Sequence, residues 1–336
     1  MVAKPKGSAA VVYALCPGAA AMAIFFGLGV LSNICLAISM AVLCEYLVWR
    51  LKGKDDANPL GTLARDREFA IILPGFILAL ALPPGAPWWL LAVAVASASL
   101  LAKHAFGGSR NAIVNPAMFG YLVVLVSYPA ALGAWPPPSS IDFSMANWIA
   151  TGLGNFIAPE PDAVTMATPL DVARHNTGYL LADLFEANPQ LRGFGGAGWQ
   201  EINLAFCAGG VFLMRQGMFR WQIPIAVLVS LSVCALLFYD EGSSASGGSP
   251  LFHLLSGGTM LGAFFIATEP NSSPTSDRAK LLYGAFIGIL IYAIRVNGDY
   301  PDGVAWAVLI ANVCAPLFDE YERYRSGRSK QQGQRL

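Results

Sequence analysis

The sequence predicts an all-α polytopic membrane protein with ten transmembrane helices. Of its 336 residues, 55% are hydrophobic and only 12% are charged, whereas soluble globular domains carry about 25% charged residues. The apolar residues form long blocks separated by short polar stretches, which is typical of bilayer-spanning segments. The Lys and Arg residues gather on alternate polar stretches, as expected of a membrane protein with a fixed orientation. We therefore expect a single membrane domain over residues 1–336.

Ten apolar blocks have the composition of membrane spans. The first five occupy residues 9–132 and the last five occupy residues 202–318, with a long polar stretch between the two groups. The blocks are 9–28, 31–51, 69–82, 88–103, 116–132, 202–213, 223–239, 251–267, 281–294 and 304–318. A full span needs about 20 residues, so several of these blocks are short.

The short blocks also contain glycine and proline. Pro74 and Gly75 lie in the third block, and Gly257, Gly258 and Gly262 lie in the eighth. Such interruptions are tolerated at membrane depth where the backbone lines a cavity or is buried in protein. We therefore expect some of the helices to be broken or to span only half of the membrane.

The two halves of the chain resemble each other weakly. Residues 73–84 of the third block resemble residues 257–270 of the eighth, and the fourth and ninth blocks end similarly, after Lys103 and Arg295. Five spans separate the members of each pair, and an odd number of spans inverts the second copy in the membrane. The pattern favours a 5+5 inverted repeat, which is a common plan of transporter folds.

The distribution of Lys and Arg predicts the orientation. With ten spans both termini lie on the same side, and 18 of the 21 basic residues fall there, which leaves only Arg174, Arg192 and Arg295 for the other side. Because cytoplasmic loops are enriched in Lys and Arg, we expect both termini to be cytoplasmic, with a basic tail over residues 319–336. The first block leads directly into a second span without an A-x-A cleavage site, so we expect a retained helix and not a signal peptide.

Charge and cysteine usage narrow the range of partners. The 21 basic residues balance 21 acidic ones, and nothing suggests a nucleic-acid partner; membrane lipid is the expected surrounding. The six cysteines all lie inside apolar blocks without a C-x-x-C pair, so we expect no metal centre held by this chain alone. No acid/base pair or nucleophile predicts an independent catalytic residue.

A polar loop over residues 133–200 separates the two groups of apolar blocks, and the predicted topology places it outside the cytoplasm. Loops of this length in compact proteins are often functional. Within it, Thr168 stands between Ala167 and Pro169, so we expect its hydroxyl on an accessible, extended segment where it can be esterified or phosphorylated. Thr-Pro is also a common turn and Asp-x-x-Thr a common cap, so the residue types alone leave a purely structural role open.

The same segment resembles a flavinylation motif. The pattern Asp-x-x-Ser/Thr-x-Ala-Thr, on which a flavin transferase attaches FMN, is present in full as Asp162, Thr165, Ala167 and Thr168. Many members of that class have Gly where Met166 stands, and this position is permissive. The resemblance implies a phosphodiester bond between FMN and Thr168.

The surrounding sequence is similar to the RnfD/NqrB family of membrane redox subunits. Four segments carry this resemblance: 103–108 (Lys-His-Ala-Phe-Gly-Gly), 115–120 (Asn-Pro-Ala-Met-Phe-Gly), 264–270 (Phe-Phe-Ile-Ala-Thr-Glu-Pro) and 300–303 (Tyr-Pro-Asp-Gly). The similarity extends from about residue 25 to residue 321. The short stretch before the first span is more similar to RnfD than to NqrB, which is longer at its N-terminus.

The resemblance implies a ten-helix subunit of the Rnf complex of the bacterial inner membrane. That complex couples electron transfer between ferredoxin and NAD to movement of Na+ or H+. The implied partners are subunits of the RnfA, RnfB, RnfC, RnfE and RnfG types, with electron exchange between the FMN on Thr168 and the flavin of the RnfG-type subunit. Thr168 would then face the periplasm. Because NqrB-like proteins hold a second, non-covalent flavin, such a cofactor stays possible here.

Two other interpretations stay open at this point. The chain could be an NqrB-like subunit of a quinone-reducing sodium pump, which its short N-terminus disfavours. It could also be a non-redox channel or transporter, because inverted repeats and broken helices suit that class equally well. Only the motif over residues 162–168 separates this last interpretation from a redox subunit.

Two polar residues fall near the expected cytoplasmic ends of spans. Glu45 lies late in the second block, where a carboxylate is costly enough to suggest ion handling; pairing with Arg50 or Lys52 at the interface is the favoured alternative. His104 follows Lys103 at the end of the fourth block and is expected to cap a helix C-terminus rather than to bind a ligand.

Other polar residues mark helix ends and turns. Asn111, Asn115 and Pro116 open the fifth block and suit either a helix N-cap or a site for a polar ring ligand. The Ser-Gly-Gly-Thr stretch over residues 256–259 allows close backbone approach, and helix packing is favoured there over contact with the flavin ring. Asp299 and Asp302 could attract cations by charge, although a solvated turn is the favoured expectation.

Overall fold

The computed structural model describes residues 7–51, 68–105, 113–141, 144–153, 166–175, 183, 186–239 and 248–333. Helices make up the secondary structure within these ranges, and the extended pairing found there is an isolated bridge between Trp135 and Met166. The prediction of an all-helical protein is confirmed for this part of the chain.

The first half contains five long helical segments. They are α1 (Ser8–Phe26), α2 (Gly29–Leu51), α4 (Glu68–Ala81), α5 (Trp88–Ala96) with its π-helical continuation η1 (Ser97–Ala105), and α6 (Pro116–Ser127). Each is rich in apolar residues, and Asn115 caps the start of α6 through a hydrogen bond from the backbone N–H of Met118 to its side-chain oxygen, 3.1 Å.

The second half repeats this order of segments. It contains α12 (Trp199–Arg215), α13 (Gln222–Leu237), the interrupted run α14 (Pro250–Leu255), α15 (Thr259–Leu261) and η5 (Gly262–Ile266), then α16 (Asp277–Asn297) and α17 (Val304–Gly333). Among the described residues between the halves are the short helices α7 (Pro129–Gly133), α8 (Met145–Ala150), η2 (Thr151–Leu153), α10 (Pro169–His175) and η3 (Pro189–Leu191).

Within the described residues, five helical segments are long and apolar enough to cross a membrane. They are Ala9–Phe26, Gly29–Leu51, Trp88–Ala105, Asp277–Asn297 and Val304–Ser326. Three shorter apolar helices accompany them: Ile72–Ala81, Pro116–Ser127 and Gln222–Leu237. The lengths and compositions agree with a polytopic membrane protein.

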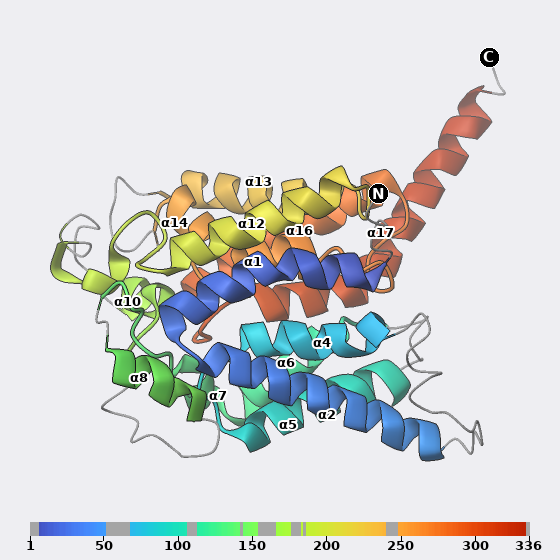
Figure 1. The fold of residues 1–336 in the computed structure, drawn as a ribbon. Coiled ribbons are helices and arrows are strands. Elements are labelled where there is room, and N and C mark those ends of the chain that lie inside the picture. Colours follow the sequence, from blue (N-terminus) through green and yellow to red (C-terminus); the bar gives the residue numbers. More distant parts are fainter. Residues whose placement is uncertain are drawn as a thin grey trace.

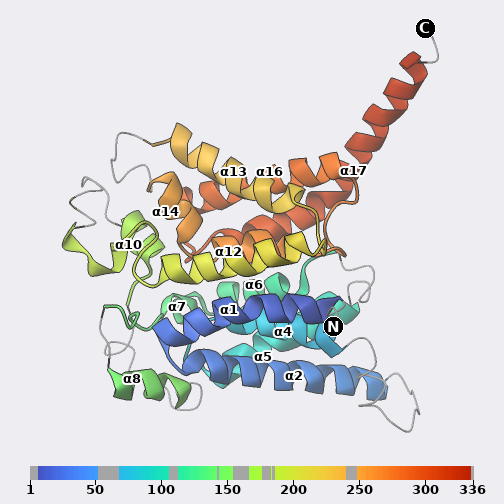
Figure 2. The same cartoon turned by 45° about the horizontal axis from the view of Figure 1, so that its top comes forward.

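The two halves pack with the same internal pattern. In the first half α4 lies against α1, α2 and α6, while α5 lies between α2 and α6. In the second half the α14–η5 run lies against α12, α13 and α17, and α16 lies between α13 and α17. Figure 2 shows the first half, coloured blue to teal, on one side of the molecule and the second half, yellow to red, on the other.

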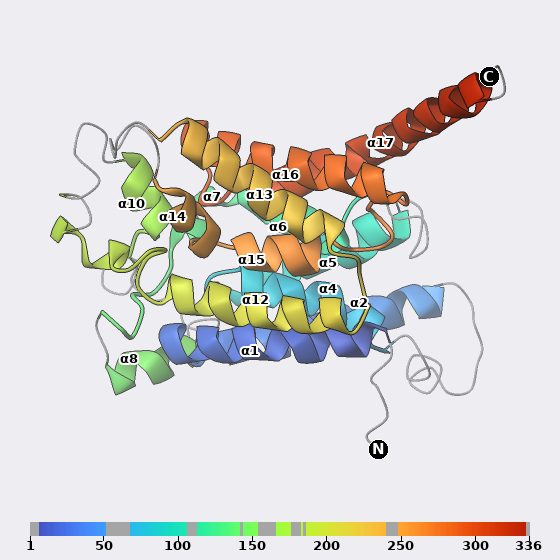
Figure 3. The ribbon, with the colours of Figure 1, turned by 90° about the horizontal axis from the view of Figure 1, so that it is seen from above.

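Two helix pairs join the halves. Helix α1 packs along α12, as the view in Figure 3 also shows, and α6 packs against α17. Most of the buried apolar side chains of both halves form one continuous core cluster. The halves are therefore one packed body, and any space between them lies inside the helix bundle.

The ends of the bundle differ in character. The start of α1 and the end of α17 lie at one end, whereas α8, α10 and α14 lie at the other (Figure 1). Helix α17 continues beyond the bundle to Gly333, so residues 319–333 of the expected basic tail are an extension of the last helix.

Two details of the expected helices are corrected. The third block is not interrupted at Pro74, because α4 runs unbroken through it; neighbouring helices can support such a proline in a membrane protein. Gly75 serves packing instead, since a Cβ there would lie 2.9 Å from the carbonyl oxygen of Ala37. The fifth block ends at Ser127 instead of residue 132, because Pro129 begins the separate helix α7.

Candidate functional site

Thr168 lies at the start of α10, at the end of the bundle opposite the chain termini (Figure 1). The segment before it is extended: the backbone N–H of Met166 donates to the carbonyl of Trp135, 2.7 Å. The Thr168 hydroxyl then donates to Oδ2 of Asp171, 2.7 Å, and accepts from the Asp171 backbone N–H, 3.3 Å. These two bonds form a capping arrangement of the kind that Thr-x-x-Asp favours at a helix start.

The expectation of an accessible Thr168 hydroxyl was wrong for this structure. The segment is extended, as predicted, but Thr168 is only 7% exposed. The reason is the Asp171 carboxylate three residues later, which draws the hydroxyl into the helix cap. Ala167 precedes it, and Asp162 and Thr165 lie outside the described residues.

Arg174 fixes α10 to the rest of the protein. Its Nη2 donates to Oδ1 of Asp171, 2.7 Å, so that both carboxylate oxygens of Asp171 have partners. Its Nη1 donates to the carbonyl oxygens of Gly298 and Tyr300, 2.6 Å each. Thr168 is thereby tied, through two side chains, to the turn between α16 and α17.

A cavity of about 80 Å³ lies beside Thr168, between the two halves of the bundle. Its walls come from α1, α4 and α6 in the first half and from α12, α15 and α17 in the second. The lining is mostly apolar and aromatic; beyond Thr168 it includes Met22, Leu80, Met118, Tyr121, Trp135, Trp199, Phe206, Gly257, Gly258 and Asp302. Thr168 also borders a second, smaller hollow of about 10 Å³, which Trp135 and Trp199 share.

Trp135 and Trp199 line the cavity together with Thr168, and Phe26 packs against both of these rings. Phe26 ends α1, Trp199 begins α12, and Trp135 follows α7. Their ring centroids lie 4.9–5.2 Å apart in tilted and edge-to-face arrangements, which are favourable aromatic geometries. Phe26 and Trp199 thus join the ends of the helix pair α1–α12, and the two tryptophans present large flat surfaces beside the Thr168 hydroxyl.

Another part of the cavity wall is backbone. Between α14 and α15 the chain leaves the helical path at Ser256, and Gly257 and Gly258 line the cavity. Gly257 has a φ of +57°, in the left-handed region that favours glycine. The residues that sequence reasoning assigned mainly to helix packing therefore form part of the wall.

Arg295 and Asp302 hold this backbone break in place. Nε of Arg295 donates to Oδ1 of Asp302, 2.9 Å, and Nη1 donates to the carbonyl of His253, 2.7 Å. Oδ2 of Asp302 accepts from the backbone N–H of Gly258, 2.7 Å. The expectation of a solvated turn was wrong for Asp302, because the Arg295 side chain, which is 2% exposed, pairs with it; Asp299 is exposed as expected.

Asn203 of α12 gives the break a second support. Its side-chain amide donates to the carbonyl oxygens of Leu255 and Gly257, 2.9 Å each, and its side-chain oxygen accepts from the backbone N–H of Met260, 3.1 Å. The residue is 1% exposed. Backbone groups that the break removes from helical hydrogen bonding are thus satisfied inside the protein.

The polar residues at the start of α6 act within the fold. The side-chain amide of Asn115 donates to the carbonyl of Ile266, 3.2 Å, and its backbone N–H donates to Oδ1 of Asn312, 2.9 Å. With the cap to Met118, these bonds use the donors and acceptor of Asn115, so its interpretation as an N-cap is confirmed. Pro116 is the first residue of α6, and Asn111 lies outside the described residues.

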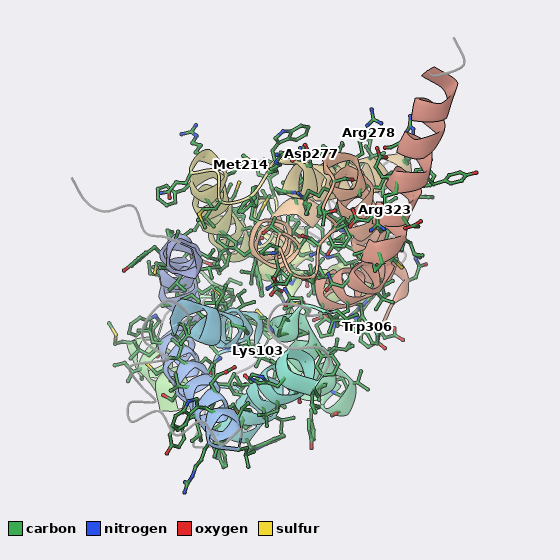
Figure 4. The ribbon with its side chains drawn as sticks, turned by 90° about the vertical axis from the view of Figure 1, so that its right-hand side faces the viewer. Lys103, Met214, Asp277, Arg278, Trp306 and Arg323 are labelled. Atoms are coloured by element: carbon green, nitrogen blue, oxygen red, sulfur yellow. The ribbon has the colours of Figure 1, made fainter. Side chains whose placement is uncertain are left out.

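A separate ionic cluster lies at the end of the bundle that carries the termini. Figure 4 views the protein from this end and labels Lys103, a member of the cluster. Nζ of Lys103 lies 2.5 Å from Oε1 of Glu45, and Nε2 of His104 lies 3.1 Å from the same oxygen. The partner expected for Glu45 was Arg50 or Lys52, and His104 was expected to cap a helix. Both expectations miss the contact between α2 and η1, which places Lys103 and His104 beside Glu45.

Sequence reasoning missed several residues of the site beside Thr168. Arg174 had a local signal, because Asp171 precedes it by three residues on the same helix face. Arg295 had a weaker one, as a basic residue directly after an apolar block on the side with few basic residues. Trp135, Trp199 and Asn203 had no local signal, since only the packing of α1 against α12 brings them to the cavity.

Comparison with known proteins gives a consistent result. The model of a family described as "NQR2, RnfD, RnfE family" matches residues 5–327. Proteins named as the D-type subunit of an ion-translocating oxidoreductase complex are similar over nearly the whole chain. That of Cellvibrio japonicus is 42% identical, over 94% of this chain and 88% of the relative. That of Ectopseudomonas mendocina is 42% identical, over 94% and 89%. That of Vibrio cholerae is 39% identical, over 92% and 91%.

Proposed function

Because the chain belongs to the NQR2, RnfD, RnfE family, we propose that it is the D-type membrane subunit of an ion-translocating oxidoreductase complex. Relatives that match over about nine tenths of their length bear that name. Their name favours this function over the quinone-reducing NqrB type, and it disfavours a non-redox channel or transporter. Electron transport coupled to ion movement, and not independent catalysis, is then the role of the chain.

We propose a topology of ten crossings arranged as two inverted repeats. The matching contacts within the halves support it, as does the placement of α1–α12 and α6–α17 between them. Arg50, Lys103, Arg215 and Arg278 stand at helix ends that face the same end of the bundle as the termini. By the positive-inside rule that end faces the cytoplasm of a bacterial inner membrane, and the 133–200 loop faces the periplasm.

We propose that Thr168 carries FMN through a phosphodiester bond, attached by a flavin transferase. The observation that carries this proposal is that Thr168, the last residue of the motif, lines an apolar cavity with aromatic walls. A flat conjugated ring suits such walls, and Gly257 and Gly258 contribute backbone to them without a side chain. When bound, the flavin would supply reversible electron transfer.

The residues fit the group in kind, but attachment requires a local rearrangement. The cavity of about 80 Å³ is smaller than the pockets of roughly 300–1,000 Å³ that hold small molecules. Esterification also removes the proton that Thr168 donates to Asp171. The new phosphodiester carries a negative charge, which the Asp171 carboxylate would repel. We therefore infer that the start of α10 moves away from the cavity when the bond forms.

The aromatic residues and Arg174 would have distinct roles around the attached group. Trp135 and Trp199 would exclude water from the ring side of Thr168, and Arg174 would neutralise the Asp171 carboxylate beside the phosphodiester. We propose electron exchange with an RnfG-type subunit and, through the complex of RnfA, RnfB, RnfC and RnfE types, coupling of ferredoxin–NAD electron transfer to Na+ or H+ movement. A second, non-covalent flavin stays a prediction to which we assign no residues.

Flavin fluorescence tests the proposal directly. The full chain is co-expressed with a flavin transferase and examined under ultraviolet light in a denaturing gel, which retains only covalently bound flavin. We expect a fluorescent band for the wild type and a dark band for Thr168→Ala. Thr151→Ala is the matched control, because Thr151 is a threonine at the same end of the bundle but outside the motif. A dark wild type, or a Thr168→Ala band as bright as the wild type, would contradict the assignment.

A further inference from the structure

The cavity beside Thr168 has one charged side chain in its described lining, that of Asp302. The guanidinium of Arg295 lies next to Gly257, another residue of the cavity wall. A Cβ on Gly257 would lie 2.5 Å from Oδ2 of Asp302 and 3.0 Å from Nη2 of Arg295. The ion pair therefore lies at the cavity wall: Asp302 lines the cavity, and Arg295 lies next to Gly257.

This pair is buried and fixed in position. The side chains of Arg295 and Asp302 are 2% and 17% exposed. Besides Asp302 and the carbonyl of His253, Arg295 donates through Nη2 to the Thr259 hydroxyl, 2.9 Å, and to the Ser256 carbonyl, 3.3 Å. Charges held this way in a low-dielectric interior act over several ångströms and are little screened by salt.

We propose that the Arg295–Asp302 pair sets the electrostatic potential of the cavity and thereby the reduction potential of the flavin on Thr168. This inference rests on the proposed function. Electron transfer into a flavin adds negative charge to its ring unless protons follow. A buried cation favours the reduced form and raises the reduction potential, whereas a buried carboxylate disfavours it and lowers the potential. The two members of the pair therefore act in opposite directions.

The geometry also explains why both charges are present. A lone arginine in this position would be an uncompensated buried charge, which proteins rarely contain. Asp302 neutralises it and also accepts the backbone N–H of Gly258 at the break. Since Asp302 lines the cavity and Arg295 does not, the two charges lie at different distances from the space inside and do not cancel completely there.

Potentiometric titration of three variants tests the inference. Asp302→Asn and Arg295→Gln each remove one charge while keeping hydrogen-bonding capacity, and the double variant removes both. Arg220→Gln is the matched control, because Arg220 belongs to an exposed ion pair with Asp277 at the opposite end of the bundle. Each full chain is co-expressed with a flavin transferase and purified in detergent, and attachment is checked by gel fluorescence. Dithionite then supplies the electrons, ferricyanide removes them, and visible absorbance follows the flavin.

We expect shifts of opposite sign. Asp302→Asn should raise the midpoint potential, Arg295→Gln should lower it, and the double variant should lie closer to the wild type than either single variant. Arg220→Gln should match the wild type. A fluorescent Asp302→Asn band with an unchanged midpoint, or single variants that shift in the same direction, would overturn the inference while leaving the flavin on Thr168 in place. A wild type without flavin would instead contradict the proposed function, and this inference with it.

Discussion

The third helical segment of each half reaches the same cavity by different means. In the first half, α4 is one continuous helix that presents the side chains of Leu80 and Ala81. In the second half, the α14–η5 run is broken after Leu255 and presents the backbone of Gly257 and Gly258. The two segments occupy equivalent places in the packing pattern of their halves. The two segments therefore have equivalent positions, but α4 lines the cavity with side chains and the α14–η5 run lines it with backbone.

The difference lies in how the backbone groups at the wall are satisfied. Where the chain leaves α4, the side-chain amide of Asn33 donates to the carbonyl of Pro83, 3.0 Å. At the second-half break, Asn203, Arg295 and Asp302 together satisfy carbonyl and N–H groups on both sides of the gap. An exposed backbone in a membrane interior is costly. In the second half, the Arg295–Asp302 ion pair satisfies part of this exposed backbone. As a result, two opposite charges lie beside the cavity.

Of the substitutions at the second-half break, removal of Arg295 should lower the stability of the protein most. Arg295→Ala leaves the Asp302 carboxylate without its cationic partner and removes the hydrogen bonds that Arg295 donates to the His253 carbonyl and the Thr259 hydroxyl. We expect a loss of about 3–5 kcal/mol of stability, measured by thermal unfolding in detergent. Arg220→Ala, at an exposed pair, should cost only about 0–1 kcal/mol. Equal losses for the two variants would show that the break does not depend on the buried pair.

The two asparagines allow the halves to be compared at the same residue type. Asn203→Ala should lower stability by about 2–3 kcal/mol, because two carbonyl groups and one N–H in a buried position lose their partner. Asn33→Ala should lower it by about 1 kcal/mol or less, because the Pro83 carbonyl loses one hydrogen bond but keeps the one from the backbone N–H of Ala86. The same unfolding measurement applies. A larger loss of stability for Asn33→Ala than for Asn203→Ala would contradict the conclusion that the second-half break depends more on side-chain support.

Gly257 tests the backbone conformation of the break itself. Gly257→Ala should cost roughly 1–2 kcal/mol, because its φ is positive and a Cβ would press on Asp302. Gly133→Ala is the control, since a Cβ there meets no atom within 4 Å and its φ is not in the left-handed region. Thermal unfolding of both variants decides the point. A neutral Gly257→Ala would mean that the wall tolerates a side chain.

Glu269, which lies just after the broken segment of the second half, predicts a pH dependence of stability. It follows η5, and burial raises the pKa of its carboxyl to about 7, although Lys103 opposes the shift. Because the folded state favours the protonated form, the stability contribution of this group is greatest below about pH 4.5 and declines as the pH rises to about 7. Glu269→Gln should flatten the pH dependence of unfolding in this window. An unchanged slope between pH 5 and 7 would contradict the shift.

Local patterns predicted the helices better than the site. Apolar blocks located α1, α2 and α16 to within a few residues, and the Gly-Gly pair at 257–258 marked the break, because these features depend on nearby residues. The burial of Thr168 depends on Asp171 and Arg174, and Arg174 in turn binds the turn at Gly298. That last contact joins residues more than a hundred positions apart, and no local periodicity encodes it.

Two ion pairs were not predicted from the sequence because they too depend on how the chain packs and not on nearby residues. Glu45 and Lys103 come from different helices, and Asp302 meets Arg295 only because the turn between α16 and α17 folds back. The basic residues were still informative as a group, because their distribution along the chain predicted which helix ends share a side. The motif predicts Thr168 as the attachment residue, and the structure places a cavity beside it.

Mass analysis of the peptide that contains Thr168 tests the central claim most directly. The full chain, co-expressed with a flavin transferase, is digested and its peptides are fragmented. The account predicts that this peptide gains the mass of one FMN less one water, with the added group on Thr168 and absent from the Thr168→Ala chain. An unmodified Thr168, or the same added mass on another residue, would contradict it.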